Sequence, residues 1–281
     1  ATRISLSIGI ISMGIAALIG IILGALAGFF GDERLKMRRS KYYFTLIGLF
    51  LGLFYGYSKR KYNISDSFSN PEISSIKEIC ISITIIIAII FAFRVMSKLI
   101  KNKWLNHEIS VPVDTFVSRG IELLNSIPRL LLIITVSAVM KERSLFIIMI
   151  IIGLTSWTGI ARFTRAEFLR IRNLEFVQAS AALGFSSSRT IFKHALPNAL
   201  LPAINVVALT IAWLVGGVVV IEVVFNYPGL GRMMIDAISD RDLPVVQAIA
   251  LIVGSAYVGV NLAADMLTMF LNPRLRTMYV K

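Results

Sequence analysis

Seven apolar stretches of this 281-residue chain have the composition and, for most, the length of membrane-crossing helices. A bilayer core about 30 Å thick needs about 20 apolar residues as an α-helix, with a range of about 17 to 25. The sequence therefore predicts an all-α fold, a polytopic transmembrane helical bundle of about seven spans. The second and third spans satisfy the length criterion only marginally. The expected spans are Ile4–Phe30, Tyr42–Tyr57, Ile79–Phe93, Leu123–Met140, Ser144–Ala161, Ala199–Ile221 and Leu243–Ala264.

The composition supports a membrane protein and disfavours several other classes. Hydrophobic residues make up 56% of the chain and its mean hydropathy is +0.77, which is too apolar for an ordinary soluble domain. The net charge of +13 comes from short Lys and Arg clusters beside the apolar runs, a pattern that orients spans and does not indicate nucleic-acid binding. Cys80 is the only cysteine, so no disulfide can form within the chain, and the sequence predicts no metal site.

The loop charges predict the orientation of the spans, because cytoplasmic loops are enriched in Lys and Arg. When residues 162–197 are placed inside, alternation of the spans puts 19 basic residues in cytoplasmic segments and 9 in external ones. Arg129 is left within a span. The cluster Lys59-Arg60-Lys61 is the exception, and it lies at the outer ends of the two marginal spans.

Residues 175–197 are the one long polar, helix-prone segment between two apolar runs. We predict a helix that continues to Leu183 and ends at Gly184, because glycine adopts the left-handed conformation of a helix end without a Cβ penalty. A serine of the run 186–188 then caps a second short helix, and Pro197 ends or kinks it. We expect this pair of helices to dock on a partner through apolar side chains, whereas a helix lying on lipid headgroups is the alternative.

Several short motifs in this segment resemble a known family. Gln178-Ala179-Ser180, then Gly184, and Leu196-Pro197 twelve residues later are similar to the EAA loop of inner-membrane permease subunits of bacterial ATP-binding-cassette importers, although Gln178 stands where Glu is usual. Glu175-Phe176-Val177 and Ala182-Leu183-Gly184 resemble its dipeptide, oligopeptide and nickel branch. In that family the loop contacts the ATPase. The resemblance thus implies ATPase coupling by Glu175, Phe176, Gln178, Ala179, Leu183, Gly184, Phe185, Phe192, Leu196 and Pro197.

The same resemblance implies a function and a set of partners. The chain would be a multi-pass permease of the bacterial cytoplasmic (inner) membrane that moves di- or oligopeptides. Expected partners are a second homologous permease subunit, two cytoplasmic ATPase subunits, an external solute-binding protein and membrane lipid. No phosphate-binding loop of the G-x-x-x-x-G-K-S/T type occurs, so the chain is expected to be a transport subunit without its own ATPase site. No cofactor is expected in this chain, because ATP would be bound by the partner subunits. Import of nickel or metal chelates, and a membrane scaffold that transports nothing, remain the alternatives.

Two further groups of residues are candidate sites. An external loop resembles that of the same branch, with Pro-Gly punctuation that requires a turn, and its candidate residues are Pro228, Gly229, Gly231, Arg241 and Asp242. Ionisable residues within spans suggest function, which makes Glu122, Asn125, Pro128 and Arg129 candidates for the translocation pathway, with simple packing as the alternative. Glu222 lies near the end of a span, and we expect it to have a structural role.

The domain organisation follows from the same comparison. Residues 1–281 are expected to form one permease transmembrane domain, trimmed at its N-terminus, with a coupling loop at 165–197. Residues 32–112 have no counterpart in the family pattern and are expected to be an insertion with two extra transmembrane helices. Its Gly48-Gly52-Gly56 ridge should pack closely against another helix. We expect the insertion to face lipid, away from the pathway.

Overall fold

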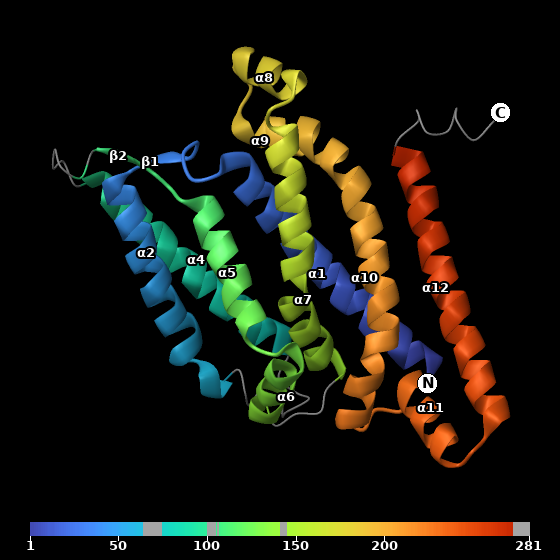
Figure 1. The fold of residues 1–281 in the computed structure, drawn as a ribbon. Coiled ribbons are helices and arrows are strands. Elements are labelled where there is room, and N and C mark those ends of the chain that lie inside the picture. Colours follow the sequence, from blue (N-terminus) through green and yellow to red (C-terminus); the bar gives the residue numbers. More distant parts are fainter. Residues whose placement is uncertain (64–74, 100–104, 106, 141–144, 272–281) are drawn as a thin grey trace, which may run out of the picture. The chain divides into compact units, whose positions relative to one another are not determined.

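The computed structural model describes residues 1–63, 75–99, 105, 107–140 and 145–271, and these are almost wholly helical (Figure 1). The all-α prediction is confirmed, although two three-residue strands were not foreseen. The elements are α1 (Thr2–Phe30), β1 (Lys36–Arg38), α2 (Arg39–Leu53), a π-helical turn (Phe54–Ser58), α4 (Ser75–Leu99), β2 (Glu108–Ser110), α5 (Val113–Ser126), α6 (Arg129–Met140), α7 (Leu145–Ile171), α8 (Glu175–Ala182), α9 (Ser187–Arg189), η2 (Thr190–Ala195), α10 (Leu196–Val224), α11 (Leu230–Ser239) and α12 (Leu243–Leu271).

The chain divides into two compact units. The main unit consists of Ala1–Phe29, Asp114–Ser137 and Arg143–Lys281. The second, which we name the hairpin unit, consists of Phe30–Val113 with Ala138–Glu142. It is thus almost the segment 32–112 in which the sequence changes character.

Close contact between α1 and α7 organises the main unit. A Cβ added to Gly24 would lie 2.5 Å from the carbonyl oxygen of Ala161, and one added to Gly28 would lie 2.5 Å from that of Arg165. One added to Gly153 of α7 would meet Ile15 of α1 at 2.7 Å. Residue numbers rise together along the two helices, so α1 and α7 run parallel. Small residues let the helix backbones approach closely, which is how helices associate where lipid removes the hydrophobic driving force.

The predicted span Leu123–Met140 is not one helix. It is broken at Ile127-Pro128, between α5 and α6, because proline has no amide to donate and disfavours helical geometry in the residue before it. The 14 residues of α5 and the 12 of α6 are each too short to cross a bilayer core of about 30 Å at about 1.5 Å per residue. The prediction of one continuous span was therefore wrong here.

Four helices of the described part of the chain are long and apolar enough to cross a membrane: Thr2–Phe30, Cys80–Leu99, Leu145–Ile171 and Leu243–Phe270. The third is longer than the predicted Ser144–Ala161 and includes residues 165–171, which we had assigned to the coupling loop. Next to α7 and α12 packs α10, whose 29 residues extend for about 43 Å.

The hairpin unit is built from two antiparallel helices and a short ribbon. Gly48 and Gly52 of α2 and Gly56 of the π-helical turn face α4, where an added Cβ would meet Phe93, Ile86 or Ser82 at 3.3 Å or less. The predicted close packing of this glycine ridge is confirmed. At the other end of α2, β1 pairs with β2 in antiparallel register, with Lys36 opposite Ser110 and Arg38 opposite Glu108. The chain thus enters and leaves this unit through paired strands.

The fold allows a matched test of the predicted orientation. Ser187 precedes α10, Ser239 ends α11 beyond its other end, and both are exposed. In a Cys80→Ser background, we expect Ser239→Cys to react with a membrane-impermeant thiol reagent in intact cells and Ser187→Cys to be protected. Both should react in detergent, which controls for local access. Labelling of residue 187 and not 239 in intact cells would invert the orientation.

Candidate functional site

Residues 175–195 form a compact helical hairpin beyond the end of α7, as α8, a glycine turn, α9 and η2 (Figure 1). Gly184 has φ +75°, as predicted. The amide of Phe185 donates to the carbonyl of Ser180 at 3.1 Å and that of Gly184 to Ala181 at 3.0 Å, a Schellman motif that satisfies the end of α8. Ser186 Oγ then accepts from the amide of Arg189 at 3.3 Å and caps α9.

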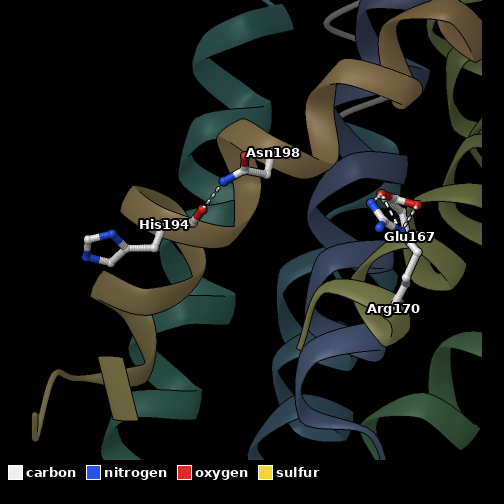
Figure 2. A network of polar contacts seen from close by, with 4 residues as sticks. All are labelled: Glu167, Arg170, His194 and Asn198. Atoms are coloured by element: carbon white, nitrogen blue, oxygen red, sulfur yellow. Dashed lines mark hydrogen bonds and ion pairs between the residues drawn. The ribbon is translucent and has the colours of Figure 1, made fainter. Parts of the chain in front are cut away.

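The second arm of the hairpin does not end at Pro197, so the first of the two predicted effects of this proline, an end or a kink, is wrong. The chain is helical from Ser187 through Val224, and Pro197 lies in the first turn of α10. Proline would clash with the carbonyl four residues earlier, at Lys193, but that residue belongs to η2, a wider π-helical stretch. The side-chain amide of Asn198 donates to the carbonyl of His194 at 2.8 Å across this irregular turn (Figure 2). The hairpin and α10 are therefore mechanically continuous.

The hairpin has one buried side and one exposed side. Val177, Ser180, Ile191 and Ala195 are buried. On the exposed side, 39% of Phe176, 72% of Leu183 and 53% of Phe192 is accessible to solvent. We name these last three residues the apolar face. Of the other candidates, Glu175, Gln178, Ala179, Gly184 and Pro197 are also exposed, whereas Leu196 is half-buried.

Phe185 lies inside the hairpin, unlike the three residues of the apolar face. Its ring is half-buried and stacks on His194, with centroids 5.9 Å apart and planes 9° from parallel. The guanidinium carbon of Arg189 lies 4.1 Å from the ring centroid, within the range of a cation–π interaction. His194 thus has a packing role. The three side chains stiffen the hairpin.

Polar contacts connect the helices of the main unit near the hairpin of residues 175–195. Arg172, at the start of the turn into α8, donates to the carbonyl of Gly28 at 3.2 Å. One turn earlier, Arg170 and Glu167 form an ion pair on α7 (Figure 2). Arg165 forms a bidentate pair with Asp114 at the start of α5. The Arg172 and Arg165 contacts thus connect the end of α7 with α1 and α5, whereas the Arg170–Glu167 pair lies within α7.

At the other end of α10, a fully buried carboxylate organises the chain. Glu222 accepts from Ser5 Oγ at 2.5 Å, from the amide of Gly231 at 2.7 Å and from that of Arg232 at 3.3 Å. Ser5 Oγ in turn accepts from the amide of Leu230 at 2.9 Å. The first three amides of α11 are thereby satisfied, and a negative charge faces the positive end of the helix. The structural role expected for Glu222 is confirmed, and the residue proves to be the centre of this end.

The carboxylate also explains the glycines of the external loop. A Cβ at Gly229 would lie 2.0 Å from the Glu222 carboxyl carbon, and one at Gly231 would lie 2.4 Å from Cα of Val219. Pro228 is exposed at the turn itself. The two glycines of the Pro-Gly-x-Gly sequence are thus required because Glu222 and Val219 leave no space for a side chain at these positions.

Arg241 and Asp242 connect α11 to α12. Arg241 has φ +57°, a left-handed conformation that suits a tight turn, and both residues are exposed. A carboxylate oxygen of Asp242 accepts from the amide of Val245 at 3.3 Å, in the first turn of α12. Arg241 therefore forms the turn between the two helices, and Asp242 caps the start of α12.

The four pathway candidates separate in the structure. Asn125 of α5 accepts from Thr158 Oγ1 at 3.1 Å, and Arg129 of α6 donates to Ser156 Oγ, so both side chains bond to hydroxyls of α7. The exposed Glu122 instead pairs with Arg119 on its own helix at 2.7 Å. Pro128 forms the break between α5 and α6. Asn125 and Arg129 therefore meet the same stretch of α7, whereas Glu122 is engaged on the surface of α5.

Comparison with known proteins places these features in a family. Residues 107–277 match the model of the binding-protein-dependent transport system inner membrane component, more than half of the chain. Over 117 residues the chain is 39% identical to a probable peptide ABC transporter permease protein, y4tP, of Sinorhizobium fredii. Over 134 residues it is 39% identical to the dipeptide transport system permease protein DppB of Haemophilus influenzae, and over 116 residues 39% identical to the glutathione transport system permease protein GsiC of Escherichia coli.

These alignments are partial. They cover 42%, 48% and 41% of this chain and 37%, 40% and 38% of the respective relatives. The chain thus aligns with less than half the length of each relative. The hairpin of residues 175–195 and Glu222 both lie within the residues that match the family model.

Replacement of Glu222 tests the buried carboxylate. In Glu222→Gln the amide keeps the shape but presents N–H groups to donors that need acceptors, so we expect a loss of roughly 1–3 kcal/mol of stability. The measurement is the thermal midpoint of the purified protein in detergent. Asp240→Asn, an exposed change at the far end of α11, the helix whose start Glu222 caps, is the control and should leave the midpoint nearly unchanged. A Glu222→Gln protein as stable as the parent would refute the assigned role.

Proposed function

Because this chain belongs to the family of binding-protein-dependent transport system inner membrane components, we propose that it is a permease subunit of an ATP-driven peptide importer. It is a multi-pass protein of the cytoplasmic membrane. The relatives described above are named for peptide, dipeptide or glutathione transport. Those names favour peptides as the cargo over nickel or metal chelates. Transport also requires partners, and we propose a second permease, two ATPases and an external binding protein.

One observation carries this proposal: the helical continuity of the hairpin with α10. The exposed apolar face offers Phe176, Leu183 and Phe192 to a groove of an ATPase, where burial of these side chains supplies the affinity. Exposed basic residues of the hairpin, Arg189 and Lys193, would steer and rim the contact. A displacement of the docked hairpin then reaches α10 without a flexible joint.

The opposite end of α10 would deliver that displacement to the external side. Glu222 ties the last turn of α10 to Ser5 of α1 and to the start of α11. When α10 tilts, α11 and the end of α1 have to follow, because separating them would expose a buried charge without partners. Met233, Ile235 and Ile238 of α11 are exposed and would form part of the surface that receives cargo from the binding protein. This coupled movement is a means of alternating access.

Asn125 and Arg129 remain candidates for contact with the cargo. Both flank the α5–α6 break, and interrupted helices supply backbone and side-chain groups to cargo sites near the middle of a membrane. Arg129 is only half-buried, so its guanidinium retains donors for a peptide carboxylate or carbonyl. Glu122 is the weaker candidate, because its carboxylate is paired on the surface of α5.

Residues 32–112 are proposed to be an insertion into this permease domain. The segment has its own helix pair and ribbon, and its boundaries nearly coincide with those of the hairpin unit. An even number of crossings leaves the orientation of α5 and all later helices unchanged.

Gly184 provides a test of coupling that separates backbone conformation from crowding. No atom lies within 4 Å of a Cβ built there, so the cost of a side chain comes from φ +75° alone. Valine resists that conformation by about 1–2 kcal/mol, whereas asparagine tolerates it. We expect Gly184→Val to lower peptide uptake per ATP hydrolysed in proteoliposomes and Gly184→Asn to keep it near the parent value. Both proteins should insert and purify normally. Normal coupling in Gly184→Val would count against the proposal.

Phe176 provides a test of docking. In Phe176→Asp, a charge enters the proposed apolar contact, and desolvating it should weaken binding of the ATPase subunits by roughly tenfold or more. Phe176→Leu keeps an apolar side chain and is the matched control. The measurement is the amount of ATPase that copurifies with each permease variant as salt and detergent are raised. Equal recovery with Asp and Leu would place the docking surface elsewhere.

A further inference from the structure

The hairpin unit contains a cavity of about 600 Å³ that the transport function does not use. It lies where the β1–β2 ribbon meets the first turn of α2 and the last turns of α4. Five cationic side chains line it: Lys36, Arg38, Lys41, Arg94 and Lys98. Glu108 is the carboxylate among its lining residues, and it lies opposite Arg38 in the ribbon register. Four more positive than negative charges thus surround one cavity.

These cations are not neutralised by the rest of the described chain. Within the residues that the structure describes, none of the five has a carboxylate within ion-pair distance. Arg94 and Lys98 are four residues apart on α4, a spacing at which like charges repel. Convergence of five cations from three elements is unfavourable without a counter-charge. The cavity is therefore electrostatically suited to an anion.

The apolar part of the lining distinguishes a lipid from a small anion. Phe91 and Val95 line the cavity, and Ile87 continues their row one turn further along α4. All three are exposed, and they lie within the candidate span Cys80–Leu99. A phosphate at Arg94 and Lys98 would thus stand at the polar end of a membrane-crossing helix, with an apolar track of the kind an acyl chain covers. A free phosphate has no apolar part that could contact these side chains.

We propose that this cavity binds the headgroup of an anionic phospholipid, with the phosphate held by Arg94, Lys98 and the basic residues of β1. An acyl chain lies along Ile87, Phe91 and Val95. The predicted orientation puts this end of the hairpin unit on the cytoplasmic side, where anionic lipid attracts basic pockets between membrane helices. The site is independent of ATPase docking, so its failure and that of the transport proposal are separately detectable.

The test compares binding of defined lipids to the purified, delipidated full chain. The probes are short-chain phosphatidylglycerol and phosphatidylcholine with matched acyl chains, and glycerol phosphate without them. Binding is followed by native mass spectrometry and by the thermal midpoint. The disruptive variant is Arg94→Gln/Lys98→Gln. The matched control is Lys59→Gln/Lys61→Gln, which removes the same charge from exposed positions at the other end of α2.

We expect phosphatidylglycerol to bind the parent and the control variant and to raise their thermal midpoints, whereas phosphatidylcholine and glycerol phosphate do not. Affinity for phosphatidylglycerol should fall roughly tenfold or more in Arg94→Gln/Lys98→Gln, because two of five cations are lost. Equal binding of the two lipids, or equal loss in the two variants, would overturn the proposal. Binding of glycerol phosphate as tight as that of phosphatidylglycerol would assign the cavity to a free anion.

Discussion

The close approach of α1 and α7 is the contact on which the main unit depends. In a bilayer, apolar side chains gain little by leaving lipid for one another, so helices associate through packing density and polar contacts. Gly24 and Gly28 place the two backbones almost in contact, and a single methyl group would collide with a carbonyl oxygen at either position. Because α1 precedes the hairpin unit and α7 follows it, this contact also joins chain segments that are more than a hundred residues apart. The hairpin unit can then vary without loss of the main packing.

The second structural constraint is that α10 is held firmly at both ends by different means. At one end it continues from η2, where the wide π-helical turn accommodates Pro197 and Asn198 bonds to His194. At the other end the buried charge of Glu222 has three donors and no access to water. A buried charge of this kind is costly to expose or leave unpaired, so it adds specificity more than net stability. A helix fixed in this way moves as a rigid body or not at all.

The sequence predicted the helices, the glycine turn with its serine cap, and the glycine ridge of α2, because each depends on local patterns of few residues. It did not predict the outcome where two local patterns conflict, as where a proline lies within an apolar helical run. Pro128 breaks an apolar run that hydropathy alone presents as one span, whereas Pro197 leaves a helix intact because a π-helical turn precedes it. Glu222 could be recognised as unusual, but its partners Ser5 and Gly231 become neighbours only in the folded chain. Three-residue strands such as β1 are too short to leave a periodic signal.

The β1–β2 ribbon gives a physical argument for the proposal that residues 32–112 are an insertion. Paired strands lie about 4.8 Å apart, so the pairing of Lys36 with Ser110 brings the two ends of this unit to nearly the same point. An insertion that starts and ends at nearly one point can replace a short connection without moving apart the two chain ends that it joins. The helix pair α2 and α4 buries its own glycine ridge and satisfies its own backbone, as a bilayer requires. Among the described residues of this unit, none of the cations that line the cavity beside the ribbon has an ion-paired carboxylate, and we propose that an anionic lipid supplies the counter-charge.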